Sequence, residues 1–339
     1  GVRDYCINQQ KPYLIECDTF RLRGHEEASG VKYVPKHLME TWSLKDPIKN
    51  YEQFLVQENV LTEMQVAEIR NRFKDQMEAD LRKAMEPETF EPSIADELVD
   101  VFAPIPANTI PDFSLVESTQ KTNKRFIEAI SDALRQSMEK YPEMIIMGQD
   151  IAEYGGAFKI TEGFVDQFGK QRIRNTPICE SAIVGAALGL SMEGMKSVVE
   201  MQFADFVTVA FNQIVNNLAK MHYRWGQNAD VVIRMPTGAG TAAGPFHSQS
   251  NEAWFFHTPG LKIVYPSNPQ DAKGLLNAAL EDPNPYLYFE HKLLYRSISG
   301  PVPDSYFTVE VGKAALAQKG TQVSIITYGM GVHWAIKAV

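Results

Sequence analysis

Glu180 is the most unusual charge in the chain. It ends a short apolar approach and begins a stretch, residues 181–189, that contains almost no polar side chain. A helix that is apolar on all sides is typical of a buried position, so a carboxylate there must be paired, hydrogen-bonded or protonated. One interpretation is a functional acid. The other is a carboxylate at a helix N-terminus that free backbone N–H groups satisfy, and the local sequence leaves both open.

His247 is a second candidate. It follows a long loop of small residues, 237–244, which itself follows a predicted strand. Loops at the carboxyl ends of parallel strands are where α/β proteins place ligands. For an isolated histidine, however, an ordinary loop position is the favoured interpretation. The glycines of this loop lack the GxGxxG spacing and open no βαβ unit, so dinucleotide binding is rejected.

His25 is a third candidate, close to Arg21 and Arg23 in the sequence. Two arginines and a histidine at the exit of a predicted strand could bind an anion. Equally, Glu26 and Glu27 could neutralise them in a solvated loop. The chain contains no GxxxxGK[ST], HExxH or GxSxG motif, so none of these common signatures competes with the three candidates.

The elements that must position Glu180 and His247 lie in residues 124–300. Helical patterns alternate there with short, continuously apolar strands. Helices are expected over 123–140, 181–193, 206–223 and 269–281, and strands over 144–147, 197–203, 231–235, 261–265 and 286–290. This alternation predicts an α/β fold, a parallel sheet covered by helices on both faces. Residues 301–339, with a strand at 323–327 and a helix at 332–339, predict the start of a further domain.

Residues 1–104 predict a different, mainly helical region. A buried strand is expected at 13–17, and a long helix begins at the capping box of Thr62 and Gln65. Apolar residues recur along this helix at three- and four-residue steps, and Pro87 ends it. These apolar residues are Val66, Ile69, Phe73, Met77 and Leu81. Residues 105–123, rich in proline and polar residues, predict a connector.

Composition excludes several classes of protein. Of 339 residues, 44% are hydrophobic and 22% charged, which excludes a mainly disordered chain, and no apolar run is long enough to span a bilayer. The net charge of −9 argues against nucleic-acid binding. Three cysteines without CxxC spacing indicate a reducing compartment, the cytoplasm. Because the chain lacks an initiator Met and stops inside a predicted helix, we expect it to be cut at both ends.

Several stretches together resemble the thiamine-diphosphate-dependent first component of the 2-oxoacid dehydrogenase complexes, over nearly the whole chain. Residues 1–100 resemble the C-terminal part of its alpha subunit, and residues from 124 on resemble its beta subunit. The matching stretches are 14–16, 19–21, 24–25 and 46–48 in the first half, and 148–150, 155–158, 175–180, 202–206, 247–250 and 271–275 in the second. The resemblance implies a fused alpha–beta form, with a thiamine-diphosphate pyrimidine-binding fold at 124–300 and the start of a transketolase C-terminal-like domain at 301–339.

The resemblance also implies roles for the candidate residues. Glu180 matches the glutamate that exchanges a proton with N1′ of the thiamine pyrimidine. Phe206 matches the aromatic residue that stacks on this ring, and Gln202 and Ile178 match residues that line it. His247 matches a histidine near the thiazolium C2, which would transfer protons and orient the 2-oxo acid or the lipoyl group.

Further implied sites concern the diphosphate and two cations. His25 matches a histidine near the diphosphate, with Arg21 in the loop that orders around it. Potassium would be held mainly by carbonyl oxygens, and a plain turn is the alternative. The potassium candidates are Ala229, Val231, Val232, Ala279, Asp282 and Asn284. The family's magnesium motif, a GDG followed by NN, is absent, and we expect it in a segment preceding Gly1.

Another departure from the family concerns regulation. Glu26 and Glu27 follow His25 where kinase-regulated relatives have a serine, so regulation by a kinase is not expected.

The implied reaction is the oxidative decarboxylation of a 2-oxo acid, with transfer of the acyl group to a lipoyl domain. Residues 202–206 look closest to branched-chain enzymes, and pyruvate and acetoin enzymes are the alternatives. A homo-oligomer is expected. Because the magnesium motif is missing, this chain alone is expected to be inactive, and a non-catalytic assembly module stays open.

Overall fold

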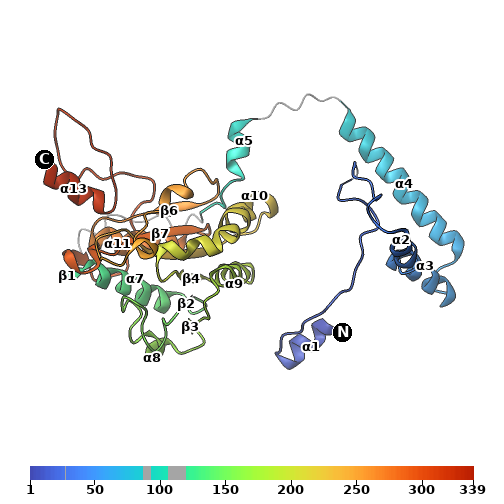
Figure 1. Ribbon diagram of the computed structural model, residues 1–339, viewed down its shortest axis with the longest axis horizontal. Helices are drawn as coiled ribbons and strands as arrows, with labels where there is room; N and C mark the ends of the chain where they lie inside the picture. The colour runs from blue at the N-terminus through green and yellow to red at the C-terminus, as the bar shows by residue number, and fades with distance from the viewer. Residues whose placement is uncertain (27, 87–92, 106–119) are drawn as a thin grey trace. The chain divides into compact units, whose positions relative to one another are not determined.

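The computed structural model describes residues 1–26, 28–86, 93–105 and 120–339, and its chain divides into two compact units (Figure 1). The first unit is Gly1–Glu91 and the second is Pro92–Val339. Pro87, which the sequence predicts to end the long helix, lies outside the described residues, as does most of the predicted connector.

The regular elements described in the first unit are all helices. Its helices are α1 (Val2–Gln9), α2 (Lys36–Ser43), α3 (Pro47–Gln57) and α4 (Glu63–Met85). The predicted capping box is confirmed: the Thr62 hydroxyl accepts from the Gln65 amide at 3.2 Å, and the Thr62 amide donates to Oε1 of Gln65 at 2.8 Å. Each of these bonds satisfies a backbone group that a helix start leaves free.

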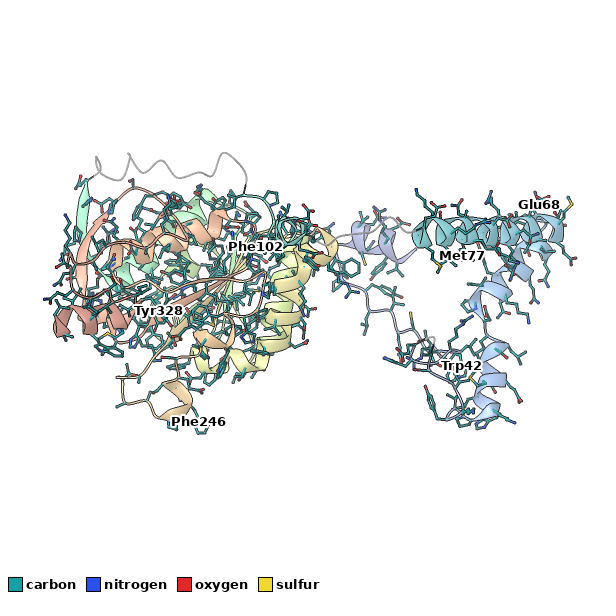
Figure 2. All side chains as sticks on the ribbon, turned by 90° about the horizontal axis from the view of Figure 1, so that it is seen from above. Trp42, Glu68, Met77, Phe102, Phe246 and Tyr328 are labelled. Carbon is teal, nitrogen blue, oxygen red and sulfur yellow. The ribbon has the colours of Figure 1, made fainter. Side chains whose placement is uncertain are left out.

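Apolar side chains of this unit lie on its surface. Phe73, Met77 and Leu81 on α4 are all more than half exposed, and Met77 is labelled in Figure 2. The predicted buried strand at residues 13–17 is wrong, since this segment is extended coil and Leu14 is 93% exposed. A strand needs a neighbour to bond its backbone, and the described part of this unit offers none.

The second unit contains the predicted parallel sheet. Its six strands run in the order β3-β2-β4-β5-β7-β6, and every neighbouring pair is parallel. The strands are β2 (Ile145–Gly148), β3 (Ile173–Asn175), β4 (Ser197–Glu200), β5 (Val231–Thr237), β6 (Lys262–Val264) and β7 (Tyr286–His291). Central strands β2, β4, β5 and β7 are buried along their whole length, as apolar runs without alternation predict.

Helices cover both faces of this sheet (Figure 1). On one face lie α7 (Phe126–Lys140) and α11 (Pro269–Glu281), whose apolar sides join the first core cluster. On the other lie α9 (Glu180–Met192) and a helical stretch from Ala204 to Trp225 that joins the second cluster. The α/β fold class is therefore confirmed.

Two of these helices differ from their sequence expectation. Although α9 is apolar, Ala182, Ala186 and Gly189 are exposed in this chain, so only one side of the helix is buried. The predicted regular helix at 206–223 is a 3-10 turn, Ala204–Ala210, then a π-helical turn, Gln213–Asn217, a 3-10 turn, Leu218–Lys220, and α10, Met221–Trp225. Tight and wide turns of this kind re-aim side chains within one helical stretch.

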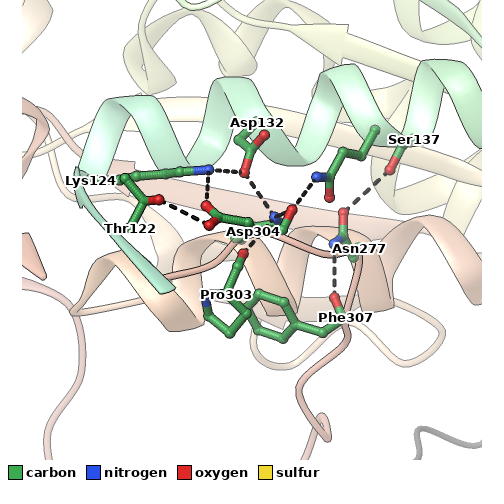
Figure 3. A network of polar contacts seen from close by, with 10 residues as sticks. Thr122, Lys124, Asp132, Ser137, Asn277, Pro303, Asp304 and Phe307 are labelled. Atoms are coloured by element: carbon green, nitrogen blue, oxygen red, sulfur yellow. Dashed lines mark hydrogen bonds and ion pairs between the residues drawn. The ribbon is translucent and has the colours of Figure 1, made fainter. Parts of the chain in front are cut away.

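A two-stranded ribbon closes the second unit beside α7. Residues Lys121–Arg125 form β1, which pairs antiparallel with β8 (Ser299–Pro303), so the helix expected from residue 123 begins only at Phe126. Figure 3 shows the polar contacts that hold this ribbon. The fully buried Lys273 of α11 donates to Asp132 at 2.8 Å and to the Pro303 carbonyl at 2.9 Å.

The remaining elements are short. They are α5 (Ile94–Val99), α8 (Phe164–Phe168), α12 (Leu294–Ser297), α13 (Met330–Ala338) and single turns at Pro245–His247 and Glu252–Trp254. The predicted strand at 323–327 is wrong: the segment is coil, and Ile326 is 95% exposed. No described strand of this chain lies beside it to pair with its backbone.

Candidate functional site

Glu180 is the first residue of α9, where the chain enters the helix from β3. Its side chain is only 5% exposed, and Gln149, directly after β2, donates a hydrogen bond from Nε2 to Oε1 at 3.1 Å. Among the described residues, no hydrogen bond reaches the other oxygen, Oε2. The carboxylate is therefore buried at a helix start and oriented through one of its oxygens by the Gln149 side chain.

A cluster of rings lies after β4 and β5. The ring of Phe203 is 4.6 Å from that of His247 and 5.8 Å from that of Phe206, and the Phe206 and His247 rings are 5.5 Å apart. All three contacts are edge-to-face, the geometry that aromatic quadrupoles favour. Phe206 and His247, which the sequence separates by 41 positions, are thus neighbours.

Strand order explains why these groups gather. Gln149 and Asp150 follow β2, Glu180 follows β3, and Gln202 follows β4, and these three strands are adjacent in the sheet. Gln202 donates to Asp150 at 3.4 Å, which links the ends of β2 and β4. Because parallel strands end at one edge, the sheet brings these polar groups together at its carboxyl edge.

The loop that carries His247 is fastened at its end. Asp205, only 5% exposed, accepts hydrogen bonds on Oδ1 from the amides of Ser248 and Gln249, each at 3.2 Å. The Gln249 carbonyl accepts from the Gly238 amide at 3.0 Å, which closes the loop at its base. The loop projects from the surface of the second unit at Phe246, which is labelled in Figure 2 and is 74% exposed.

A buried ion cluster lies in the sheet below this edge. Arg234 on β5 is fully buried and donates to Glu290 at 2.7 and 2.8 Å and to Glu200 at 2.7 Å. The Tyr295 hydroxyl also donates to Glu290, at 2.7 Å. Burial raises the pKa of Glu200, and the charge of Arg234 opposes that shift. The cluster fixes the ends of β4, β5 and β7 relative to one another.

Three other predicted site residues are exposed. Ile178 is 83% exposed. Arg21 and His25 belong to the first unit, where both are exposed and Arg21 donates to the Arg23 carbonyl at 3.2 Å. Their loop is tight, since a Cβ on Gly24 would lie 2.0 Å from the Ser29 carbonyl oxygen. Their implied roles at the diphosphate stay predictions.

The side chains among the potassium candidates are already bonded. Asp282 pairs with the Lys262 ammonium and accepts from the Tyr286 hydroxyl at 2.8 Å. Asn284 bonds the backbone of Ala103, accepting from its amide at 2.7 Å and donating to its carbonyl at 2.9 Å. The other four candidates, Ala229, Val231, Val232 and Ala279, are buried. A monovalent cation there would compete with Lys262, and potassium stays a prediction.

The described residues contain neither a cluster of metal ligands nor a membrane-spanning helix. Within the described ranges, no three His, Cys, Asp or Glu side chains converge as a metal site. No helix in those ranges combines the length and the apolar character needed to cross a bilayer.

Sequence reasoning assigned no site role to four residues at the carboxyl edge: Gln149, Phe203 and Asp205, which lie in the family-matching stretches 148–150 and 202–206, and Lys292. Lys292, directly after β7, is 4% exposed, and its ammonium lies 5.5 Å from the centre of the Phe203 ring. All four lie within five residues of the carboxyl end of a buried strand, and that position was the available signal.

Comparison with known proteins decides the family. Residues 123–297, more than half of the chain, match the family described as "Transketolase, pyrimidine binding domain", and residues 1–93 match "Dehydrogenase E1 component". The 2-oxoisovalerate dehydrogenase subunit beta of Bacillus subtilis (strain 168) is 46% identical over 215 residues, 63% of this chain and 66% of that protein. The chain belongs to the 2-oxoacid dehydrogenase first-component family.

Other matches of this first-component chain agree. The mitochondrial 2-oxoisovalerate dehydrogenase subunit beta of Dictyostelium discoideum is 39% identical over 232 residues, 68% of the chain and 62% of that protein. The pyruvate dehydrogenase E1 component subunit beta of Bacillus subtilis is 42% identical over 214 residues, 62% of the chain and 66% of that protein. The matched stretch thus spans less than two thirds of these relatives.

A solved structure described as "Split gene transketolase, inactive beta4 tetramer" gives a TM-score of 0.51 at 21% identity, over 63% of this chain and 66% of that one. At that identity the likeness concerns the fold alone. It agrees with the parallel sheet and its covering helices.

Proposed function

We propose that this first-component chain provides the pyrimidine-binding side of a thiamine-diphosphate site. The enzyme would decarboxylate a 2-oxo acid oxidatively and pass the acyl group to a lipoyl domain. The observation that carries the proposal is Glu180, buried at the start of α9 and held by Gln149, with no hydrogen bond to Oε2 from the described residues. The names of the relatives and the two family matches support the reaction class.

The residues at the carboxyl edge fit a flat, basic heterocycle. Glu180 offers a carboxyl group that can exchange a proton with a ring nitrogen, and Phe206 offers an aromatic face to stack on the ring. Gln202, partly buried and bonded to Asp150, can line the same ring together with Ile178. When bound, thiamine diphosphate supplies the carbon nucleophile and the electron sink for decarboxylation.

The chain's own residues would then act as follows. Glu180 holds a proton at N1′ of the pyrimidine and returns it, while the Gln149 amide keeps the carboxyl group in one orientation. His247, partly exposed at the end of its loop, moves a proton near the reacting carbon and orients the 2-oxo acid or the lipoyl group. The ring cluster excludes water from one side of this edge.

Two residues of the first unit are candidates for binding the diphosphate. His25, with Arg21 in the same loop, would contact the diphosphate through charged donors. A GDG…NN stretch would hold Mg²⁺, and this sequence contains none, so we expect the chain alone to bind the cofactor weakly. The six potassium candidates named above would bind the ion if potassium displaces the Lys262 ammonium from Asp282.

We propose a branched-chain 2-oxo acid as substrate. Two of the three relatives compared above are named 2-oxoisovalerate dehydrogenases, and the one with 46% identity exceeds the pyruvate dehydrogenase match at 42%. The test is turnover of the enzyme, complete with a GDG…NN segment, on 2-oxoisovalerate, 2-oxoisocaproate and pyruvate. We expect kcat/KM to be highest for the two branched substrates, and a clear preference for pyruvate would overturn the assignment.

Partners and compartment complete the proposal. A homo-oligomer is expected, and the solved transketolase relative of similar fold is described as a tetramer. A cytoplasmic location is proposed on the cysteines: all three, Cys6, Cys17 and Cys179, are free thiols.

A separate measurement tests cofactor binding itself. Calorimetric titration with thiamine diphosphate and Mg²⁺ should give weak or undetectable heat for the chain alone and clear binding for the complete enzyme. If the complete enzyme also fails to bind, the chain is an assembly module and the proposed reaction is wrong.

A further inference from the structure

Lys292 is a buried charge that the proposed reaction leaves without a task. It follows β7 and is 4% exposed, and its backbone amide donates to the Thr237 carbonyl at the end of β5 at 3.0 Å. Over the described part of the chain, no atom accepts a hydrogen bond from its ammonium. A buried ammonium without an acceptor is costly, so it calls for an explanation in its surroundings.

Asp205 is the complementary charge. Its Oδ1 accepts the Ser248 and Gln249 amides, as described above, while its Oδ2 is buried and has no donor among the described residues. The charge of Asp205 opposes the effect of burial on the pKa of Lys292. Two buried groups of opposite charge thus each carry an atom without a hydrogen-bond partner among the described residues.

Both charges act on His247 through other groups. Asp205 holds the two backbone amides directly after the histidine. The Lys292 ammonium lies over the Phe203 ring, 5.5 Å from its centre, and that ring packs against the His247 ring at 4.6 Å with an interplanar angle of 89°. A cation over an aromatic face fixes the ring's orientation, and the ring in turn supports the imidazole.

We infer that Lys292 and Asp205 together position His247, which makes Lys292 a positioning residue at the carboxyl edge of the sheet. Asp205 fixes the backbone of the loop, and Lys292 fixes the ring against which the imidazole packs. The inference rests on the proposed function for the task of His247, but the placement of the loop can be measured without any cofactor.

The titration of neighbouring groups agrees with this arrangement. Burial lowers the pKa of Lys292 to about 8, and the charge of Asp205 opposes the shift, so the ammonium form predominates at neutral pH. His291, the adjacent residue, has its pKa lowered to about 4 by burial and by the charge of Lys292, so it is neutral there. Lys292 is then positively charged where its ammonium lies over the Phe203 ring.

The experiment compares three variants of the whole chain with the parent, without cofactor. Lys292→Met removes the charge and keeps the length, Lys292→Arg keeps the charge, and Lys313→Met removes an exposed lysine that pairs only with Glu310 on the surface. The readouts are amide hydrogen exchange at Ser248 and Gln249 and the NMR shifts of the His247 ring.

We expect Lys292→Met to raise exchange at both amides several-fold, up to about tenfold, and to shift the His247 ring signals, since it removes the cation that lies over the ring against which the imidazole packs. Lys292→Arg should restore most of the parent behaviour, and Lys313→Met should match the parent. If Lys292→Met does not fold, Lys292→Gln, which also removes the charge, should show the same faster exchange.

Two results would overturn the inference. One is unchanged exchange and unchanged His247 signals in Lys292→Met or, if that variant does not fold, in Lys292→Gln. The other is a Lys292→Arg variant that behaves like Lys292→Met, because the side chain would then act by shape alone. Failure of thiamine diphosphate to bind the complete enzyme would refute the proposed function and leave this measurement unaffected.

Discussion

Helices α4 and α7 carry the same kind of apolar pattern but differ in what covers it. On α4, Phe73 and Leu81 are 62% and 59% exposed, whereas on α7 Phe126 and Leu134 are completely buried against the sheet. Most helical stability in proteins comes from packing of the apolar face. The apolar face of α7 therefore contributes packing energy to the second unit, whereas the apolar face of α4 contributes little among the described residues of the first.

The two units also hold their charges differently. In the first unit the Arg70–Glu52 pair is exposed on the arginine side, and such pairs contribute at most about 1 kcal/mol. In the second, Arg234, Glu200 and Glu290 are bonded to one another while almost fully buried. A buried charge is stable only when opposite charges or hydrogen bonds compensate it. These contacts therefore fix β4, β5 and β7 relative to one another near the carboxyl edge, where the candidate site lies.

The largest effect should come from the buried carboxylate that the second unit keeps for chemistry. Glu180→Gln preserves size and the bond from Gln149 but cannot exchange a proton, so turnover of the complete enzyme should fall by about 10² to 10⁴. Thermal unfolding should stay close to that of the parent. Glu193→Gln, an exposed glutamate directly after α9, is the control and should keep full activity. Near-normal turnover of Glu180→Gln would leave Glu180 as a helix-start carboxylate.

The helix comparison is tested by one matched pair of truncations. Leu134→Ala on α7 should lower the free energy of unfolding by about 2–5 kcal/mol, because it leaves a cavity in the core. Leu81→Ala on α4, at an exposed site, should change it by less than about 0.5 kcal/mol. Urea unfolding followed by circular dichroism measures both. A large loss in Leu81→Ala would mean that α4 packs against a surface, such as a second copy, under the conditions of the measurement.

This contrast also explains which parts of the fold the sequence could predict. Periodicity and caps locate α4 and α7 within a few residues, and apolar runs locate β2, β5 and β7, because those signals are local. The pattern of α4 carries no information on what covers it, and residues 13–17 and 323–327 read as strands although they have no pairing partner in the described chain. Strand formation depends on a neighbour that local sequence does not encode.

The site was predictable to a similar degree. Glu180 stood out because a charge interrupts an apolar stretch, and the family resemblance supplied Gln202, Phe206 and His247. Neither signal pointed to Lys292, whose significance depends on Phe203 and Asp205, 89 and 87 positions away. Contacts of that range follow from the order β4-β5-β7 in the sheet, which only the assembled fold provides.

A smaller effect is expected at the polar contacts of Figure 3, where the second unit uses a buried lysine as a fastener. Lys273→Met keeps the stem but leaves the Pro303 carbonyl without its donor, and Asp132 keeps Lys124 as a partner. The free energy of unfolding should fall by about 1–3 kcal/mol. Faster hydrogen exchange along β1 and β8 would locate the loss at the ribbon. Exchange that rises equally throughout the sheet would contradict a local fastener.

The last effect concerns pH, and it differs between the units because it depends on burial. His291 is 5% exposed, its Nδ1 accepts the Leu293 amide at 3.3 Å, and burial lowers its pKa to about 4. Its neutral ring packs so closely on Gly238, whose φ is +86°, that a Cβ there would lie 2.3 Å from Nε2. Between the ordinary histidine pKa of about 6.5 and pH 4, His291 is protonated in the unfolded chain and neutral in the folded chain. The stability that is present above about pH 6.5 is therefore lost as the pH falls toward 4.

His291→Gln should remove this part of the acid sensitivity. Between pH 7 and pH 4, the parent should lose up to about 3 kcal/mol more than the variant, as the linkage between the two pKa values requires. Urea unfolding at several pH values measures the difference, and His25→Gln, at an exposed histidine of the first unit, is the matched control that should leave the pH profile unchanged. Parallel profiles for parent and His291→Gln would mean that His291 accepts a proton without opening its packing against Gly238, and the second unit would then be less rigid at its carboxyl edge than its contacts indicate.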